Sequence, residues 1–285
     1  MSSPLGGDFS GAKQEYKMKI FLFMLVTVNQ AMAVSLENLS SLKDSDYVKL
    51  HSAVVDHDYH VYIKTPPQAA DETDKKWPVV YLLDGGNTFP MFVPYAKYMT
   101  FFEEIPPLII VGISYGTDDW RQGNNRSTDF TLPAQDRAHY GGAEKFHQFL
   151  ATELIPMVED KYPADPEQRI LFGHSLGGQF SLYTAMFQPQ TFSGIIASNP
   201  AIHRNTALFL GDIQATTFQP RLFIMQADKD NAEYQTPRKK WLDYWQEKPH
   251  HWQVQVMTAQ GHNHMSSITT AFRQGMVWLF PKVNQ

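Results

Sequence analysis

The sequence of 285 residues predicts an α/β fold with a mostly parallel central sheet, helices on both faces and antiparallel strands at the N-terminal edge. From Tyr47 onward, short apolar runs alternate with longer segments of helical periodicity, as in proteins built from repeated strand and helix units. Two runs, 79–83 and 108–113, are apolar throughout, which is typical of strands buried on both faces. No repeat or long linker interrupts this alternation, so we expect a single domain over residues 34–285.

The individual elements follow from the same periodicities. Strands are expected at 47–55, 60–64, 79–83, 108–113, 170–172, 194–197, 222–226 and 252–257. Helices are expected at 143–158, 177–187, 237–247 and 267–280. Pro156 lies inside the first helix, where the missing hydrogen bond to Thr152 should cause a kink. Because ligands of such sheets bind at the carboxyl ends of the strands, functional side chains are expected directly after them.

Composition and charge exclude several classes of protein. Hydrophobic residues make up 43% of the chain, enough for one large core, so neither a disordered nor a fibrous protein is expected. Lys and Arg number 24 against 29 Asp and Glu, a net charge of −5, and no basic cluster marks a nucleic-acid interface. The absence of cysteine excludes disulfides, thiolate catalysis and cysteine-ligated metal centres.

Residues 18–33 have the three-part pattern of a secretory signal peptide. Lys19 is followed by an apolar run over 20–28, and the motif Ala-Met-Ala at 31–33 fits the small-residue cleavage site. The run is too short to span a bilayer, which takes about 20 residues. We therefore expect residues 1–33 to be an N-terminal extension with this signal, and the mature chain to be secreted or periplasmic without a stable membrane span. A buried core helix is the alternative interpretation.

A serine stands in the pattern expected of a nucleophile. The segment 173–177 reads G-H-S-L-G, with an apolar strand before it and helical periodicity after it, which is the context in which G-x-S-x-G presents a reactive serine. We expect Gly173 and Gly177 to be required because side chains there would collide across the tight turn that carries Ser175. Gly178 should let the helix approach the sheet. A glycine-rich turn with an incidental serine is the alternative.

An acid should support this serine through a histidine, and it is expected just past the next long core strand, at 222–226. Asp228 and Asp230 both follow that strand. Asp230 is favoured, because Ala227 stands three residues before it, as a small residue does in the usual turn. Asp228 remains the alternative.

The general base is expected in the loop after the strand at 252–257, where His262 and His264 are the candidates. These histidines and the acidic segment 228–230 could also be interpreted as a metal site. That segment lacks the glycine of a calcium-binding loop, and we expect neither a metal nor an organic cofactor.

The reaction of a serine with an ester develops a negative oxygen, which two preorganised N–H groups must stabilise. The amide of Leu176, directly after the serine, is the first expected donor. The second should come from the glycine-containing segment after the strand at 79–83, where we choose the Gly86 amide, with Asn87 as the alternative.

Segments along nearly the whole mature chain resemble, in the same order, the putative esterase family of α/β-hydrolases, which includes enterochelin (siderophore) esterases, esterase D and feruloyl esterases. The matching segments are 81–86, 111–113, 126–131, 149–156, 173–178, 198–200 and 261–266. The resemblance implies an α/β-hydrolase fold without a large lid domain, with Ser175 as nucleophile and His264 as base. Asn199 stands where a serine is commoner in the family, a departure that concerns the substrate wall.

These residues predict a serine carboxylic-ester hydrolase that forms an acyl-enzyme with a small-molecule ester outside the cytoplasm, such as a siderophore ester. Asn87, Arg126 and His174 are the candidate substrate contacts, although Arg126 and Asp129 could instead form an ion pair that orders their loop. The alternatives are a non-catalytic binding protein on the same fold and an acyltransferase with an acceptor other than water.

Overall fold

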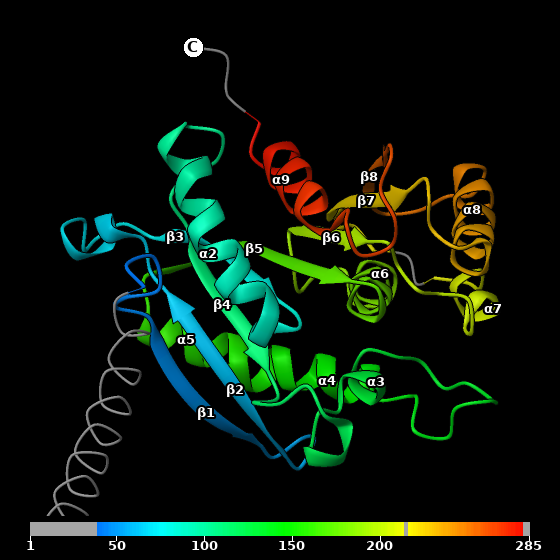
Figure 1. Cartoon of the computed structure of the whole chain (residues 1–285), viewed down its shortest axis with the longest axis horizontal. Helices are drawn as coiled ribbons and strands as arrows, with labels where there is room; N and C mark the ends of the chain where they lie inside the picture. The colour runs from blue at the N-terminus through cyan, green and yellow to red at the C-terminus, as the bar shows by residue number, and fades with distance from the viewer. Residues whose placement is uncertain (1–38, 214–215, 282–285) are drawn as a thin grey trace, which may run out of the picture. The chain divides into compact units, whose positions relative to one another are not determined.

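The computed structural model describes residues 39–213 and 216–281 (Figure 1). The chain divides into two units, Met1–Lys43 and Asp44–Gln285, and the strands and helices named below belong to the second. The expected signal peptide at 18–33 lies outside the described residues. Among the residues that are described, none of the helices combines the length and the hydropathy that crossing a bilayer requires.

An eight-stranded sheet in the order β1-β2-β4-β3-β5-β6-β7-β8 forms the centre of the second unit. Strand β2 pairs antiparallel with β1 and β4, and the other neighbours are parallel, which confirms the predicted fold class. The strands are β1 (Asp46–Ser52), β2 (His57–Lys64), β3 (Trp77–Leu82), β4 (Ile109–Ser114), β5 (Ala164–His174), β6 (Gly194–Ser198), β7 (Arg221–Ala227) and β8 (Gln253–Ala259).

Helices cover both faces of this sheet (Figure 1). Helices α2 and α9 lie on one face, where Phe92 and Phe272 stack with ring centroids 4.1 Å apart. Helices α4, α5 and α6 lie on the other, where Phe146 contacts Phe180, and α8 packs beside α6 through Trp241. The helices are α2 (Gly85–Phe101), α3 (Arg126–Asp129), α4 (Ala143–Phe149), α5 (Ile155–Lys161), α6 (Leu176–Phe187), α7 (Thr206–Phe209), α8 (Ala232–Gln246) and α9 (Ile268–Leu279).

The helix expected at 143–158 is interrupted rather than simply kinked. A single π-helical turn, Leu150–Leu154, separates α4 from α5, and Pro156 stands in the first turn of α5. The first turn of a helix needs no hydrogen bond from its own amides, so a proline is tolerated there. The wider turn before it lets the chain continue in the same direction.

Two helices differ more strongly from expectation. Helix α2 was not predicted, because Pro90 and Pro94 lie inside it and each removes a backbone hydrogen bond. Helix α8 begins at Ala232, five residues before Pro237, which was expected to start it. In both cases burial of one helix face outweighs the local cost of proline, and in α2 the buried face includes Phe89, Phe92 and Val93.

The connections of the sheet diverge at the carboxyl ends of two neighbouring strands, β3 and β5. After β3 the chain passes through α2 to β4, whereas from β5 onward it runs the other way through β6, β7 and β8. Open parallel sheets bind ligands where the connections diverge in this way, here next to the ends of β3 and β5.

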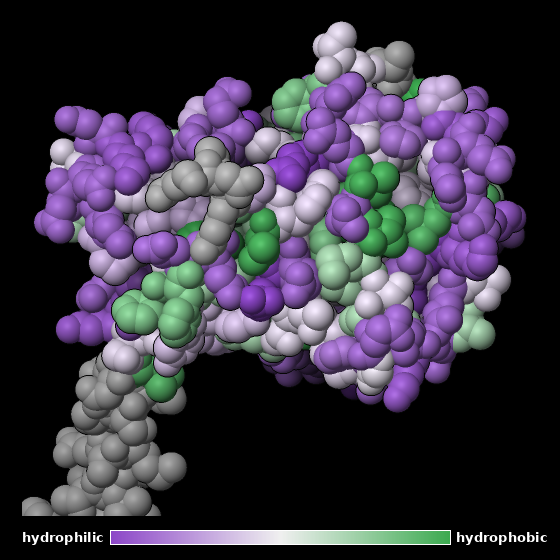
Figure 2. Space-filling model, turned by 90° about the horizontal axis from the view of Figure 1, so that it is seen from above, coloured by the Kyte–Doolittle hydropathy of each residue, from purple (hydrophilic) through white to green (hydrophobic). Residues whose placement is uncertain are grey.

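The face seen in Figure 2 is mostly hydrophilic, with hydrophobic residues in small, separate patches. Large exposed hydrophobic side chains occur on well-separated elements, such as Phe101 in α2, Val254 in β8 and Met265 before α9. Scattered exposed hydrophobic residues of this kind are usual in globular proteins, so the candidate site is sought among the polar groups at the carboxyl ends of the strands.

Candidate active site

Ser175 stands on a strained turn between β5 and α6. Its backbone has φ 58° and ψ −114°, a conformation that costs a non-glycine residue about 1–3 kcal/mol. The end of β6 holds this turn from both sides: the Ser175 amide donates to the Ser198 carbonyl at 2.9 Å, and the Ser175 carbonyl accepts from the Ala201 amide at 3.0 Å. The strain therefore persists because neighbouring backbone fixes the serine in this position.

Two of the three glycines around the serine are required by close contacts, and one of these two was not the expected partner of Gly173. A Cβ atom on Gly173 would lie 2.1 Å from the Gly177 carbonyl oxygen, so glycine is required there. A Cβ on Gly177 would meet only ordinary contacts, at 3.5 Å or more, so the expectation for that position was wrong. A Cβ on Gly178 would lie 2.6 Å from the Ser198 carbonyl oxygen, which allows α6 its close approach to β6.

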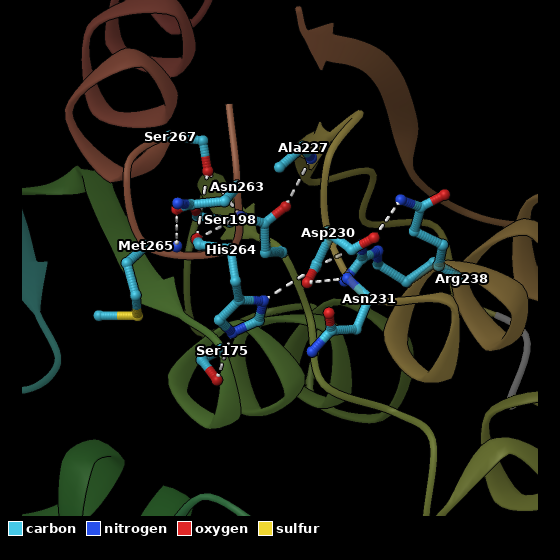
Figure 3. A network of polar contacts seen from close by, with 12 residues as sticks. Ser175, Ser198, Ala227, Asp230, Asn231, Arg238, Asn263, His264, Met265 and Ser267 are labelled. Carbon is cyan, nitrogen blue, oxygen red and sulfur yellow. Dashed lines mark hydrogen bonds and ion pairs between the residues drawn. The ribbon is translucent and has the colours of Figure 1, made fainter. Parts of the chain in front are cut away.

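His264 connects the serine to a buried carboxylate (Figure 3). Its Nε2 lies 2.9 Å from Ser175 Oγ, and its Nδ1 lies 2.8 Å from Asp230 Oδ2. The side chain of His264 is 19% exposed, whereas that of Asp230 is 1% exposed. The structure thus brings together, in one hydrogen-bonded line, the three residues proposed as nucleophile, base and acid.

Asp230 is held as an anion at the end of this line. Its Oδ1 accepts from the Asn231 amide at 2.8 Å, and its Oδ2 accepts from Arg238 Nη2 at 2.8 Å. Burial raises the pKa of Asp230, but the hydrogen bonds from His264 and Arg238 outweigh burial and hold the pKa below its ordinary value. A charged carboxylate at this place fixes the imidazole with its Nδ1 protonated and its Nε2 turned to the serine.

The alternative acid and base contact each other instead. Asp228 is exposed, and its Oδ1 accepts from the backbone amide of His262 at 3.1 Å. The Nδ1 atom of His262 lies 2.9 Å from the carbonyl oxygen of Ser266. Neither side chain contacts Ser175 within the described part of the chain, and both order the loop that carries His264.

Replacement of Asp230 by asparagine is expected to lower kcat for ester hydrolysis on the order of 10,000-fold, because the amide no longer stabilises the imidazolium or selects its tautomer. Asp228→Asn is the matched control and should change kcat little. Steady-state kinetics of both variants on one aryl ester measure this difference, and equal losses would assign the role of acid to neither residue.

The two expected oxyanion donors lie at helix N-termini. Leu176 is the first residue of α6 and Gly86 the second of α2, where amides lack partners within the helix and the helix dipole is positive. Among the described residues, neither amide has a hydrogen-bond acceptor. The alternative, the Asn87 amide, donates to the Asp84 carbonyl at 2.9 Å and is therefore already engaged.

Arg126 and Asp129 do not form the ion pair that was considered for them. Arg126 donates instead to both carboxylate oxygens of Asp84, from Nε at 2.6 Å and from Nη2 at 2.9 Å. Asp129 Oδ2 accepts from the hydroxyls of Tyr59 and Tyr115, at 2.7 and 2.9 Å. Burial raises the pKa of Asp129 to about 6, although the two hydrogen bonds act in the opposite direction.

The two remaining candidate substrate contacts, Asn87 and His174, differ in how far their side chains are exposed to solvent. Asn87 is exposed, and its Nδ2 lies 3.4 Å from Asp118 Oδ1. His174 is only 5% exposed: its ring lies 5.1 Å from that of His264, centroid to centroid, and its Nδ1 lies 2.9 Å from Ser198 Oγ. Burial, more than the neighbouring His264, lowers the pKa of His174 to about 3. His174 therefore packs as a neutral ring beside the base, and its role as a substrate contact stays a prediction.

Asn199 was expected to concern the substrate wall, which was wrong: it is fully buried, and both atoms of its side-chain amide have partners in the site. Its Nδ2 donates to the His264 carbonyl at 2.8 Å and to Ser267 Oγ at 2.6 Å, while its Oδ1 accepts from the Ala227 amide at 2.8 Å. It thereby ties together the loops that carry the acid and the base. Its position directly after the buried strand β6 was the available signal.

Two residues of α8 were missed as well. Tyr234 stacks on the His264 ring with centroids 4.9 Å apart, and Arg238 donates to Asp230. Arg238 precedes Trp241 and Trp245 by three and seven residues, a spacing that places it on their buried helix face. Within residues 39–213 and 216–281, no group of three or more His, Asp or Glu side chains could hold a metal ion.

The chain is similar to known proteins over most of the described residues. A family model described as "Putative esterase" matches residues 52–276. The ferri-bacillibactin esterase of Bacillus subtilis is 34% identical over 169 residues, which cover 53% of this chain and 56% of that protein. The siderophore triacetylfusarinine C esterase of Aspergillus fumigatus is 31% identical over 142 residues, 48% of this chain and 49% of that protein. The chain thus spans about half the length of the curated relatives it matches.

Solved structures share the fold. The Bacillus cereus BES protein superposes with a TM-score of 0.70 at 24% identity, covering 83% of this chain and 95% of that one. An IroE-like serine hydrolase from Shewanella oneidensis gives a TM-score of 0.70 at 22% identity, covering 83% and 80%. At these identities the likeness concerns the arrangement of strands and helices.

Proposed function

Because the chain belongs to the putative esterase family, we propose that it is a serine carboxylic-ester hydrolase that works through an acyl-enzyme. The observation that supports this most directly is the line of hydrogen bonds from Ser175 through His264 to Asp230 at the carboxyl edge of the sheet. A non-catalytic binding protein would require neither this line nor the strained backbone of Ser175.

In the first half of the reaction, Ser175 Oγ attacks the ester carbonyl carbon while His264 Nε2 accepts its proton. The amides of Leu176 and Gly86 stabilise the negative oxygen of the tetrahedral intermediate. The carbon–oxygen bond to the alcohol then breaks, and His264 returns the proton to the departing alkoxide. In the second half, His264 activates a water molecule that hydrolyses the acyl-enzyme and restores the serine.

The substrate class we propose is a siderophore-type ester. The proposal is supported by the printed names of the curated relatives, several of which are siderophore esterases. Arg126, with Nε and Nη2 bound to Asp84, has no partner for Nη1 among the described residues, so that Nη1 is available to an acceptor oxygen of the substrate. Asn87 lies in the first turn of α2 beside the proposed Gly86 donor and is the second substrate contact.

We further propose that the mature chain acts outside the cytoplasm, on the basis of the signal pattern at 18–33. N-terminal sequencing of the protein recovered from its native cells should then begin at Val34. Recovery of an intact N-terminal segment from the soluble cytoplasmic fraction would contradict this.

The activity is tested by hydrolysis of short and long aryl esters and of a siderophore lactone, together with labelling by a fluorophosphonate. We expect hydrolysis of both ester classes, a higher kcat/KM for the lactone, and one phosphonate adduct, located on Ser175 by peptide mass spectrometry. Hydrolysis of aryl esters alone would contradict the substrate class, and a folded protein that neither hydrolyses any ester nor reacts with the phosphonate would contradict the activity itself.

A further inference from the structure

Arg238 is a buried cation with a single partner. It stands on α8, is 2% exposed, and donates from Nη2 to Asp230 Oδ2 at 2.8 Å (Figure 3). Its Nε and Nη1 atoms are also buried, and neither has a hydrogen-bond partner among the described residues. In the part of the chain that the structure describes, the carboxylate of the proposed acid is therefore the group that compensates this guanidinium charge.

A contribution to folding does not explain this arrangement. Removing a guanidinium from water is costly, and one hydrogen bond to a carboxylate leaves most of its donors unsatisfied. Hydrophobic residues of similar volume often replace such buried pairs with no loss of stability. Trp241 and Trp245, on the same buried face of α8, show that this face is otherwise filled by apolar rings. The charge at position 238 is better explained by its effect on Asp230.

Arg238 and the base share one oxygen atom. Asp230 Oδ2 lies 2.8 Å from Arg238 Nη2 and 2.8 Å from His264 Nδ1. A cation on that oxygen neutralises part of the negative charge that would otherwise stabilise a protonated imidazole. It also repels the imidazolium directly through a medium of low dielectric constant. Both effects favour the neutral, proton-accepting form of the base.

The other side chains that contact the base bring no positive charge to it at neutral pH. His174, from the end of β5, is buried and has its pKa lowered to about 3, so it carries no charge at neutral pH. Tyr234, from α8, contacts the His264 ring by stacking. Ser175 contacts Nε2 from the start of α6.

The charged side chains farther out have partners of their own. Asp228 and His262, in the loops after β7 and β8, contact each other. Arg126 of α3 is bound to Asp84, and Glu233 of α8 lies 3.6 Å from His203. Within the described residues, Arg238 is thus the cation in direct contact with the proposed acid.

We propose that Arg238 is a positioning residue that orients Asp230 against His264 and, by its charge, sets how far into acidic solution the esterase remains active. This inference rests on the proposed function, in which His264 must be neutral to accept the proton of Ser175. It assigns to α8 a role in setting the lower limit of the working pH range.

The test compares pH profiles of kcat/KM for the native protein with those of Arg238→Met, Arg238→Gln and Arg238→Lys. Methionine and glutamine remove the charge, whereas lysine keeps it. We expect the acid limb to move to higher pH by about one unit in the two neutral variants and to stay near the native position in Arg238→Lys. Lys239→Met is the matched control, because it removes an exposed charge from the next position of α8 and should leave the limb unchanged.

An acid limb that stays at the native position in every folded neutral variant would overturn the proposal, as would an equal displacement in Arg238→Lys. Because glutamine can still donate to Asp230, it also provides a test if the methionine variant does not fold. The ring signal of His264 in histidine-labelled protein, assigned with His264→Gln, gives a second readout by NMR. If the signal titrates at higher pH in Arg238→Gln while no ester is hydrolysed, the role of Arg238 stands and the proposed activity fails.

Discussion

Replacement of Ser175 by alanine is expected to lower kcat for ester hydrolysis on the order of 10,000-fold or more. The reason is chemical: alanine offers no oxygen to form the acyl-enzyme, and the 2.9 Å contact with His264 Nε2 is lost. What remains is the catalysis that oxyanion donors and substrate binding give to direct attack by water. Stopped or continuous assays on one aryl ester, with protein free of host esterases, measure the loss.

Ser193→Ala is the matched control for this prediction. The Ser193 hydroxyl donates to the Arg169 carbonyl at 3.2 Å, directly before β6 begins and so at the amino end of the parallel strands, whereas Ser175 follows the carboxyl end of β5. The Ser193→Ala variant should retain native kcat. A fluorophosphonate should label this variant, but it should not label Ser175→Ala. A loss of only a few-fold in Ser175→Ala would reject Ser175 as the nucleophile.

Replacement of His264 by glutamine should reduce kcat by a factor on the order of 10,000 or more, because His264 is the imidazole hydrogen-bonded to Ser175 Oγ among residues 39–213 and 216–281. Glutamine cannot accept the serine proton, so the loss should persist at every pH between the limits of protein stability. A pH profile of kcat for this variant therefore lacks the acid limb that the native protein shows.

His262→Gln is the comparison that makes the result specific. His262 lies two residues away, and its Nδ1 contacts the Ser266 carbonyl oxygen instead of the serine. We expect its kcat to fall only slightly, through loosening of the loop that carries His264. If the two variants lost activity equally, the base would have to be reassigned.

The fold was largely predictable because its central strands are buried on both faces. Strands β3 and β4 have no exposed residue, and their sequences therefore appear as continuous apolar runs. Helix α2 could not be predicted in the same way, since Pro90 and Pro94 signal an interruption that tertiary packing overrides. The length of β5 was underestimated as well, because its first part, from Ala164, carries the polar residues Asp165, Glu167 and Gln168.

The candidate site was predictable to the extent that it depends on the order of strands. The turn of Ser175 and the loops of Asp230 and His264 each follow a core strand, and the parallel arrangement brings their ends together. Their catalytic roles remain predictions for the experiments above. The partner of Arg126 was not predictable, because it depends on the direction of the side chain. Arg126 binds Asp84, which lies 42 positions earlier in the sequence, and does not contact Asp129.

Arg238 was missed because arginine in a helix is usually exposed. Its helical spacing from Trp241 and Trp245 was visible, but a charged residue on an apolar face is interpreted as an interruption of that face. The contact with Asp230 links positions eight residues apart across a turn and the start of a helix, and local periodicity contains no information about it.

Ser175 and His264 are 89 positions apart in the sequence, so the ribosome adds them to the chain at different times. At about 5–20 residues per second, a ribosome adds the histidine roughly 4–18 s after the serine. During that interval the nascent polypeptide contains an ordinary alcohol without its proton acceptor. Under the proposed mechanism, newly synthesised molecules thus gain activity only after translation has passed both positions and the intervening strands have assembled.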